Sequence, residues 1–226
     1  VSPIIEMRSE LKKRVERKGD PWDRRQNALK WLLVTCFGYT GYRNARFGRI
    51  ECHEAICSWS RDILLEAKSV AEEEGWGCLH AIVDSIWLKD EWGRGKDAQT
   101  ESIERVLYKI EKFSGIPIEL EDVYDWIAFV PNRTTGSSSL TKYFAYGERG
   151  WKIRGIELRQ HSTCEWVKDM QMRVLSELNE RGHVEGVEAS LRHYRREAAR
   201  MREGAVPLSE LIISRRVQSD LLSYKV

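Results

Sequence analysis

The sequence contains no run of 18 apolar residues and no signal-peptide pattern. These absences argue against a membrane-spanning helix and a secreted precursor, so we expect a soluble, intracellular protein of the cytoplasm. No segment repeats at a fixed period, which argues against a repeat architecture.

Cysteine is sparse: the chain has five, an odd number, and none forms a CxxC pair. This pattern does not indicate a disulfide framework or a zinc site, so we expect reduced thiols inside a cell. The histidines show no ligand spacing either, and we assign none of them to a metal: His53, His80, His161, His183 and His193.

The chain contains enough apolar residues to form a folded core. Apolar residues make up 42% of the 226 positions, and nine are tryptophan, so the sequence predicts one large domain or two modest ones. The net charge of +2 hides an asymmetry, because residues 1–50 hold 12 Lys and Arg against 5 Asp and Glu. A basic end of this kind suggests a polyanionic partner, although a solvated helical hairpin fits the same count.

The order of elements predicts a helical hairpin, a mixed α/β middle and a helical end. Asp20 is a plausible N-cap, with Pro21 at the first helical position. Helices are expected, from apolar spacing and turn signals, over Ile4–Arg17, Trp22–Phe37, His53–Glu74, Ala98–Phe113, Glu165–Arg181, His183–Glu203 and Leu208–Leu222.

Strands are predicted in the middle of the chain. A strand or hairpin is expected at Cys78–Leu88, and further strands at Pro117–Pro131 and Thr141–Ile156. The soft loop at 132–139 is the best candidate for a domain boundary.

Residues 25–48 are the most informative segment. Lys30 is the only lysine in a helix-like run that ends at Phe37-Gly38, and a second aromatic–glycine step follows in Tyr39-Thr40-Gly41-Tyr42. Lysine neutralises a phosphate or donates a proton to it, and an aromatic ring beside glycine offers a flat wall next to accessible backbone. This combination suits a site that holds a nucleotide against a base pair.

Two further cations lie upstream of Lys30. Arg8 and Lys12 are four residues apart, so they share one face of the first helix. If the hairpin packs antiparallel, that face lies beside Lys30, and three cations match a triphosphate. Taken alone the trio is also ordinary for an exposed helix.

Asp84 lies in an apolar, strand-like run between Val83 and Ser85, where an unpaired buried carboxylate is costly. Such a residue is a metal ligand, caps a turn or pairs with an arginine. One carboxylate does not build a two-metal phosphoryl-transfer site, and no second acid stands at an obvious spacing.

Two segments are expected on adjacent strands, Lys142-Tyr143 and Arg154-Gly155. They would place a cation and an aromatic ring on one surface, which suits a sugar-phosphate backbone. The alternative is a surface ion pair between Arg154 and Glu157. The basic run at 192–202 is read as the solvated face of a late helix.

In this order, the motifs resemble the C-terminal portion of an archaeal-type family B DNA polymerase, and the resemblance covers nearly the whole chain. It implies an α+β fold: a fingers helical hairpin (1–48), a partial antiparallel-sheet palm with packed helices (49–157) and a mostly helical thumb (158–226). The segments that carry it are Glu6-Met7-Arg8 with Lys12, Arg25-Gln26 through Lys30 to Phe37-Gly38-Tyr39, His80–Ser85, Lys142-Tyr143 and Arg154-Gly155-Ile156-Glu157.

The resemblance also implies roles for these residues. Arg8, Lys12 and Lys30 would grip the triphosphate, with Lys30 a general acid toward the pyrophosphate leaving group. Phe37 and Gly38 would contact the nucleotide, and Asp84 would bind Mg²⁺ in a two-metal site completed by an aspartate outside this chain. The remaining matched positions imply DNA contacts: Tyr39, Gly41, Tyr42, Lys142, Tyr143, Arg154 and Gly155.

The sequence departs from the family pattern in three places: the first two remove polar contacts near the base pair, and the third weakens the case for catalysis. Val34-Thr35 replaces the family's Asn-Ser, and Phe37 lacks the hydroxyl of the usual tyrosine. In the strand motif, the first aspartate position holds Ile82, so only Asp84 remains.

The implied function is a nucleotidyltransferase that extends a primer on template DNA. The implied partners are primer–template DNA, dNTPs and an N-terminal half or large subunit outside this chain, with a sliding clamp as an additional candidate; no membrane is involved, and a nucleoid location is expected. The chain is read either as a polymerase fragment or as the small subunit of a split polymerase, and we expect no activity from it alone. The alternatives are a non-catalytic DNA-binding or structural subunit derived from a polymerase, and a helical protein-interaction module.

Overall fold

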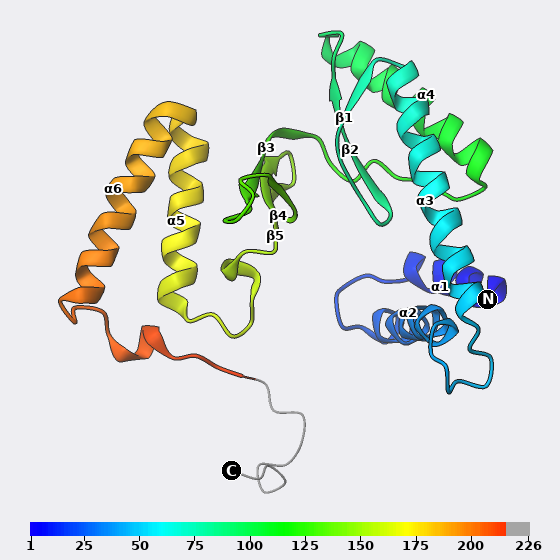
Figure 1. The fold of residues 1–226 in the computed structure, drawn as a ribbon, viewed down its shortest axis with the longest axis horizontal. Coiled ribbons are helices and arrows are strands. Elements are labelled where there is room, and N and C mark those ends of the chain that lie inside the picture. Colours follow the sequence, from blue (N-terminus) through cyan, green and yellow to red (C-terminus); the bar gives the residue numbers. More distant parts are fainter. Residues whose placement is uncertain (216–226) are drawn as a thin grey trace, which may run out of the picture. The chain divides into compact units, whose positions relative to one another are not determined.

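The structure is a computed structural model that describes residues 1–215. The chain divides into two compact units, Val1–Ile118 and Glu119–Val226 (Figure 1). Both units mix helices with an antiparallel sheet, in agreement with the expected α+β composition. Within residues 1–215, none of the helices combines the length and apolar character needed to cross a bilayer.

Unit 1 begins with a helical hairpin, in which α1 (Ser2–Lys13) packs against α2 (Pro21–Thr40). The predicted N-cap is confirmed, because the Asp20 side chain accepts a hydrogen bond from the Asp23 N–H at 2.6 Å. The same carboxylate also accepts the N–H groups of Glu16 and Arg17, at 3.0 and 3.3 Å. These bonds take up the backbone donors of residues 16 and 17, so α1 ends at Lys13, four residues before the predicted end.

The rest of unit 1 is a hairpin packed on two helices. Helix α3 (Ile50–Glu73) leads into strands β1 (Trp76–Ile82) and β2 (Ser85–Asp90), followed by α4 (Lys96–Ser114). The strands pair antiparallel, so the hairpin reading of this segment is confirmed. A core of Ala67, Ala71, Val106 and Ile110 joins α3 to α4, and apolar side chains of both strands, including Trp76 and Leu88, pack against it.

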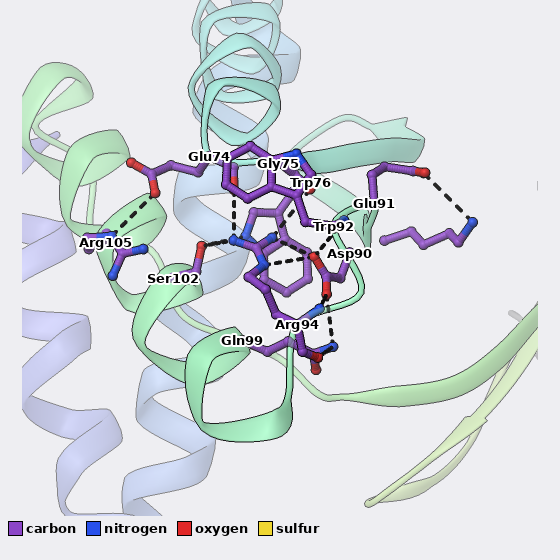
Figure 2. Close-up of polar contacts among 11 residues, drawn as sticks. Glu74, Gly75, Trp76, Asp90, Glu91, Trp92, Arg94, Gln99, Ser102 and Arg105 are labelled. Atoms are coloured by element: carbon purple, nitrogen blue, oxygen red, sulfur yellow. Dashed lines mark hydrogen bonds and ion pairs between the residues drawn. The ribbon is translucent and has the colours of Figure 1, made fainter.

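Arg94 closes the base of this hairpin (Figure 2). Its guanidinium lies 4.8 Å from the Trp76 ring and 5.0 Å from the Trp92 ring, and it forms an ion pair with Asp90 at 2.7 Å. It also donates to the carbonyl of Glu74 at 2.8 Å and to Ser102 Oγ at 2.5 Å. One side chain therefore ties β2 to the end of α3 and to α4.

Unit 2 opens with a three-stranded antiparallel sheet in the order β3 (Tyr124–Pro131), β4 (Ser138–Gly147), β5 (Gly150–Arg154). A short 3-10 helix, η1 (Glu157–Arg159), leads to the paired helices α5 (Glu165–Arg181) and α6 (His183–Arg202). Ile153, Ile156 and Leu175 form its core, which joins the sheet to α5.

Several predicted elements of unit 2 differ from the structure. Residues 117–123 are not strand, and the sheet begins only at Tyr124. The loop at 132–139 joins two paired strands, so the expected domain boundary there is wrong; the units divide between Ile118 and Glu119. Of the predicted helix Leu208–Leu222, residues 208–211 form the 3-10 helix η2 (Leu208–Leu211), 212–215 are not helical, and the remainder lies outside the described residues.

Candidate nucleotide and nucleic-acid sites

Lys30 and Phe37 lie on one face of α2. Gln26, Lys30, Leu33 and Phe37 recur every three or four residues, so their side chains emerge along one stripe. Gln26 is the buried residue of this helix, and Lys30, one turn further on, is exposed. Because α2 packs against α1, the buried Gln26 indicates that the stripe begins at the α1 interface.

Arg8 and Lys12 are placed on the partner helix of this hairpin. Ile4, Arg8 and Leu11 are the half-buried residues of α1, which puts Arg8 on the side that packs toward α2, whereas Lys12 is exposed. Among residues 1–215, none of Arg8, Lys12 and Lys30 forms an ion pair, and the enclosed Nε of Arg8 has no hydrogen-bond partner. The hairpin therefore carries cations that no carboxylate of the described chain neutralises.

The aromatic–glycine segment forms the junction between α2 and α3. The Phe37 ring stacks on the His53 ring of α3, with centroids 4.5 Å apart and planes at 23°, and Tyr39 meets Tyr42 edge to face at 5.9 Å. A Cβ added at Gly41 would lie 3.1 Å from His53, whereas one added at Gly38 would meet nothing within 4 Å. Packing against His53 thus favours glycine at 41, while the backbone at 38 is open to approach.

Asp84 does not lie in a buried strand, and that expectation is wrong. Val83 and Asp84 form the two-residue turn between β1 and β2, and both side chains are exposed. Val83 has a φ of 55°, a left-handed conformation that strains a β-branched residue. The apolar residues on either side of this turn belong to strands β1 and β2, which pair antiparallel.

The carboxylate of Asp84 does not by itself fit a Mg²⁺ site. Mg²⁺ takes near-octahedral oxygen coordination, usually with one or two carboxylates and a phosphate ligand. Among residues 1–215, no group of three or more His, Cys, Asp or Glu side chains is arranged to hold a metal. The described residues thus provide one exposed carboxylate and not a complete centre.

The β1–β2 hairpin runs back from its base toward the α2 end of α3 (Figure 1). Strand β1 starts beside the C-terminal end of α3, packs along that helix and has seven residues. Seven strand residues span about 23 Å, the rise of about 15 helical residues. The hairpin is therefore long enough to extend back along α3 in the direction of the half in which His53 contacts Phe37.

In unit 2, Tyr143 and Arg154 are cross-strand partners of β4 and β5, so their side chains emerge on the same side of the sheet. Arg154 is exposed, but Tyr143 is only 5% exposed and packs 5.8 Å from the Phe129 ring. Tyr143 therefore offers little surface to a ligand. Lys142 is exposed and, as the neighbouring strand residue, emerges on the other side.

Gly155 has a structural requirement of its own. Its φ is +69°, and an added Cβ would lie 2.2 Å from the carbonyl oxygen of Thr141. The next acidic residue, Glu157, accepts a hydrogen bond from Gln171 at 2.8 Å, which lowers the pKa of Glu157. The positive charges of Lys142 and Arg133 act on that pKa in the same direction.

Arg154 also lines a groove of about 460 Å³ between β5, η1 and α5. Lys152 and Arg159 bring two more cations to this groove, and Trp151, Ile153, Leu158 and Met172 supply its apolar lining. Lys152 is paired with Glu121, whereas Arg154 and Arg159 are exposed. The groove has the charge and apolar surface that suit a phosphate-bearing ligand.

Sequence reasoning missed His53 and Arg94, because His53 contacts Phe37 and Arg94 contacts Glu74 and Ser102, all distant in the sequence. The local signal for Arg94 was Asp90 four residues before it and Trp92 two residues before it, in a loop that follows a strand. The basic run at 192–202 is only partly a solvated face, since Arg200 and Arg196 contact the buried carboxylate of Glu197 at 2.7 and 3.4 Å.

Comparison with known proteins finds no family model that matches the chain. DNA polymerase 2 of Saccharolobus solfataricus is 30% identical over 192 residues, which cover 77% of this chain and 28% of that protein. The DNA polymerase of Archaeoglobus fulgidus is 28% identical over 93% of this chain and 26% of its own length, and that of Thermococcus sp. is 27% identical over 98% and 28%.

A solved structure shares the fold. The family B DNA polymerase from Pyrobaculum calidifontis matches with a TM-score of 0.61 and 23% identity over 100% of this chain and 28% of that one. The chain therefore spans a little over a quarter of the length of the relatives it matches. It is a distant homologue of archaeal family B DNA polymerases.

Proposed function

We propose that this chain supplies the fingers (1–48), the second half of the palm (49–157) and the thumb (158–226) of a template-directed DNA polymerase. The observation that carries the proposal is the alignment of 77% to 98% of the chain with proteins that are DNA polymerases. It is supported by the stripe on α2, which brings Lys30 and Phe37 to one face, and by the unneutralised cations of α1.

In this function, Arg8, Lys12 and Lys30 bind the triphosphate of the incoming nucleotide. Their charges offset the charge that builds up on the phosphates as the primer 3′ oxygen attacks, and they hold the phosphates in line for that attack. Lys30 then donates a proton to the departing pyrophosphate. Phe37 and the open backbone at Gly38 face the nucleotide.

Asp84 contributes one carboxylate to metal binding, and the carboxylate that completes the site comes from outside this chain. Phosphate contacts in unit 2 come from Lys142, Arg154 and the groove of Arg159. Since such contacts are electrostatic, the affinity of the chain for primer–template DNA falls steeply as salt rises. A helical interaction module would show no salt-dependent DNA binding.

The first test is nucleotide binding by the 226-residue chain. Lys30→Ala weakens dNTP binding by about tenfold, the loss of one charge-assisted phosphate contact. Lys18→Ala removes one positive charge from the loop after α1 and serves as the matched control, with no change beyond about twofold. Equal effects of the two substitutions would refute the assignment of Lys30.

The second test separates catalysis from a structural role. The chain alone is expected not to extend a primer, and robust extension by pure protein would contradict that expectation. Combined with the polypeptide that carries the remaining polymerase motifs, Asp84→Asn should abolish extension, whereas Asp62→Asn, at an exposed position of α3, should not.

A second candidate function is a catalytically impaired DNA-binding or structural subunit derived from a family B polymerase. Ile82 favours it, because family members carry the first aspartate of the strand motif at the matching position and this chain has isoleucine there. This candidate predicts full extension by the assembled enzyme that carries Asp84→Asn, together with retained salt-dependent DNA binding.

A further inference from the structure

His53 contacts the end of α2 in three ways. Its ring stacks on Phe37 at 4.5 Å, its Nδ1 lies 3.1 Å from the hydroxyl of Thr40, and its ring carbons lie beneath the Cα of Gly41, where a Cβ would come within 3.1 Å. All three partners belong to the aromatic–glycine segment. His53 itself comes from α3, so it joins two helices.

The hydrogen bonds define how the imidazole is held. The Thr40 hydroxyl has a single proton and donates it to the Phe37 carbonyl at 2.6 Å. Its oxygen therefore accepts from His53, which carries its proton on Nδ1 in this arrangement. The carbonyl of Thr40 in turn accepts the N–H of Arg49 at 2.8 Å, which ties the connection between α2 and α3 to the same residue.

Phe37 depends on this contact for its orientation. Phenylalanine has no hydroxyl through which a hydrogen bond could fix its ring, and Phe37 is 42% exposed as a residue. One side of the ring lies on His53, and the exposed part faces outward on the stripe that carries Lys30. Two helical turns, about 10 Å, separate Lys30 from Phe37 along that stripe.

We propose that His53 is a positioning residue for nucleotide recognition, which holds the Phe37 ring in the orientation that contacts the base and sugar of the incoming nucleotide. This inference rests on the proposed function. The cations of the hairpin bind the phosphates, and the ring supported by His53 recognises the nucleoside. Loss of His53 therefore weakens the nucleoside contact and leaves the phosphate contact intact.

The experiment compares dATP with inorganic tripolyphosphate, which has the phosphates and no nucleoside. Binding of each to the 226-residue chain is measured with Mg²⁺ present. His53→Ala weakens dATP binding by about fivefold, the factor expected for one lost aromatic contact, and changes tripolyphosphate binding by less than about twofold. Glu54→Gln, at the neighbouring exposed position, serves as the control and changes neither.

Two conservative variants separate stacking from hydrogen bonding. His53→Phe keeps a ring against Phe37 without the donor to Thr40, and it retains dATP binding within about twofold of the unsubstituted chain. His53→Asn keeps an N–H donor without the ring and behaves like His53→Ala. The opposite ranking of these two variants would overturn the proposed role of the stacked ring.

Thermal unfolding and far-UV circular dichroism of each variant show whether the hairpin remains folded. Parallel weakening of dATP and tripolyphosphate by His53→Ala would mean that the hairpin itself is disturbed, and it would overturn this inference while leaving the proposed function standing. An unsubstituted chain that binds neither ligand would overturn both. Selective loss of dATP binding supports both.

Discussion

We expect the substitution Arg94→Met to destabilise unit 1 by about 4 kcal/mol. The guanidinium is enclosed, with only 13% of the side chain exposed, and it binds the Asp90 carboxylate and the Glu74 carbonyl (Figure 2). Methionine retains an apolar chain between Trp76 and Trp92 but provides no donor. The carboxylate and the carbonyl would then lose their partner inside the fold.

The magnitude follows from the contacts that disappear. A hydrogen bond to a charged group contributes about 1.5–3 kcal/mol, and removing one partner of an enclosed ion pair costs about 3–5 kcal/mol. The two cation–π contacts add about 0.5–1 kcal/mol each, part of which the methionine side chain recovers by packing on the same rings. These terms are not additive, so about 4 kcal/mol is the expected net loss.

Urea unfolding followed by tryptophan fluorescence and circular dichroism measures the change. The matched control is Arg105→Met, since Arg105 also pairs with Glu74 but its side chain is 55% exposed. That surface pair is worth less than about 1 kcal/mol. Equal losses for the two arginines would refute the role of enclosure, and a double variant with Asp90→Asn should be more stable than Arg94→Met alone.

Three further outcomes are expected. Burial raises the pKa of Asp90, but hydrogen bonds from the side chain and backbone of Arg94, from Gln99 and from the backbone of Trp92 outweigh this and lower the pKa from 3.8 to about 2. The ionised form is therefore favoured in the folded state, and the stability it contributes above pH 4 is lost as the pH falls toward 2. Melting temperatures across that range should show this decline, and the decline should be smaller in Arg94→Met, which keeps the backbone and Gln99 donors. Val83→Gly relieves the left-handed strain at the exposed hairpin turn, so urea unfolding should show a free energy of unfolding of unit 1 that is higher by about 0.5–1 kcal/mol. A loss of stability would show that the Val83 side chain makes a stabilising contact. Gly155→Ala lowers the free energy of unfolding of unit 2 by about 3 kcal/mol, because the added Cβ clashes with backbone and the φ is unfavourable for alanine. Gly150→Ala is the control: its φ is also positive, at +91°, but the space around it is open, so it costs about 1–2 kcal/mol. Similar losses for the two variants would argue against the clash.

Local signals in the sequence located most elements. Asp20 and Pro21 mark the start of α2 because a short carboxylate side chain and a fixed φ act within one helical turn. The apolar spacing of α3 predicted its length to within a few residues, and the C-terminal part of that helix supplies Ala67 and Ala71 to the core. The end of α1 was not predicted, because it depends on the Asp20 carboxylate reaching back to residues 16 and 17.

Some features of the candidate site could likewise be predicted from local sequence, and others could not. The sequence by itself determined which residues share a helix face, such as Lys30 and Phe37, because helical geometry relates positions a few residues apart. Only the tertiary structure decided that Asp84 lies in an exposed turn and that His53 supports Phe37. Burial and contacts between elements depend on how segments far apart in the sequence pack together. The spacing of residues within one segment does not reveal that packing.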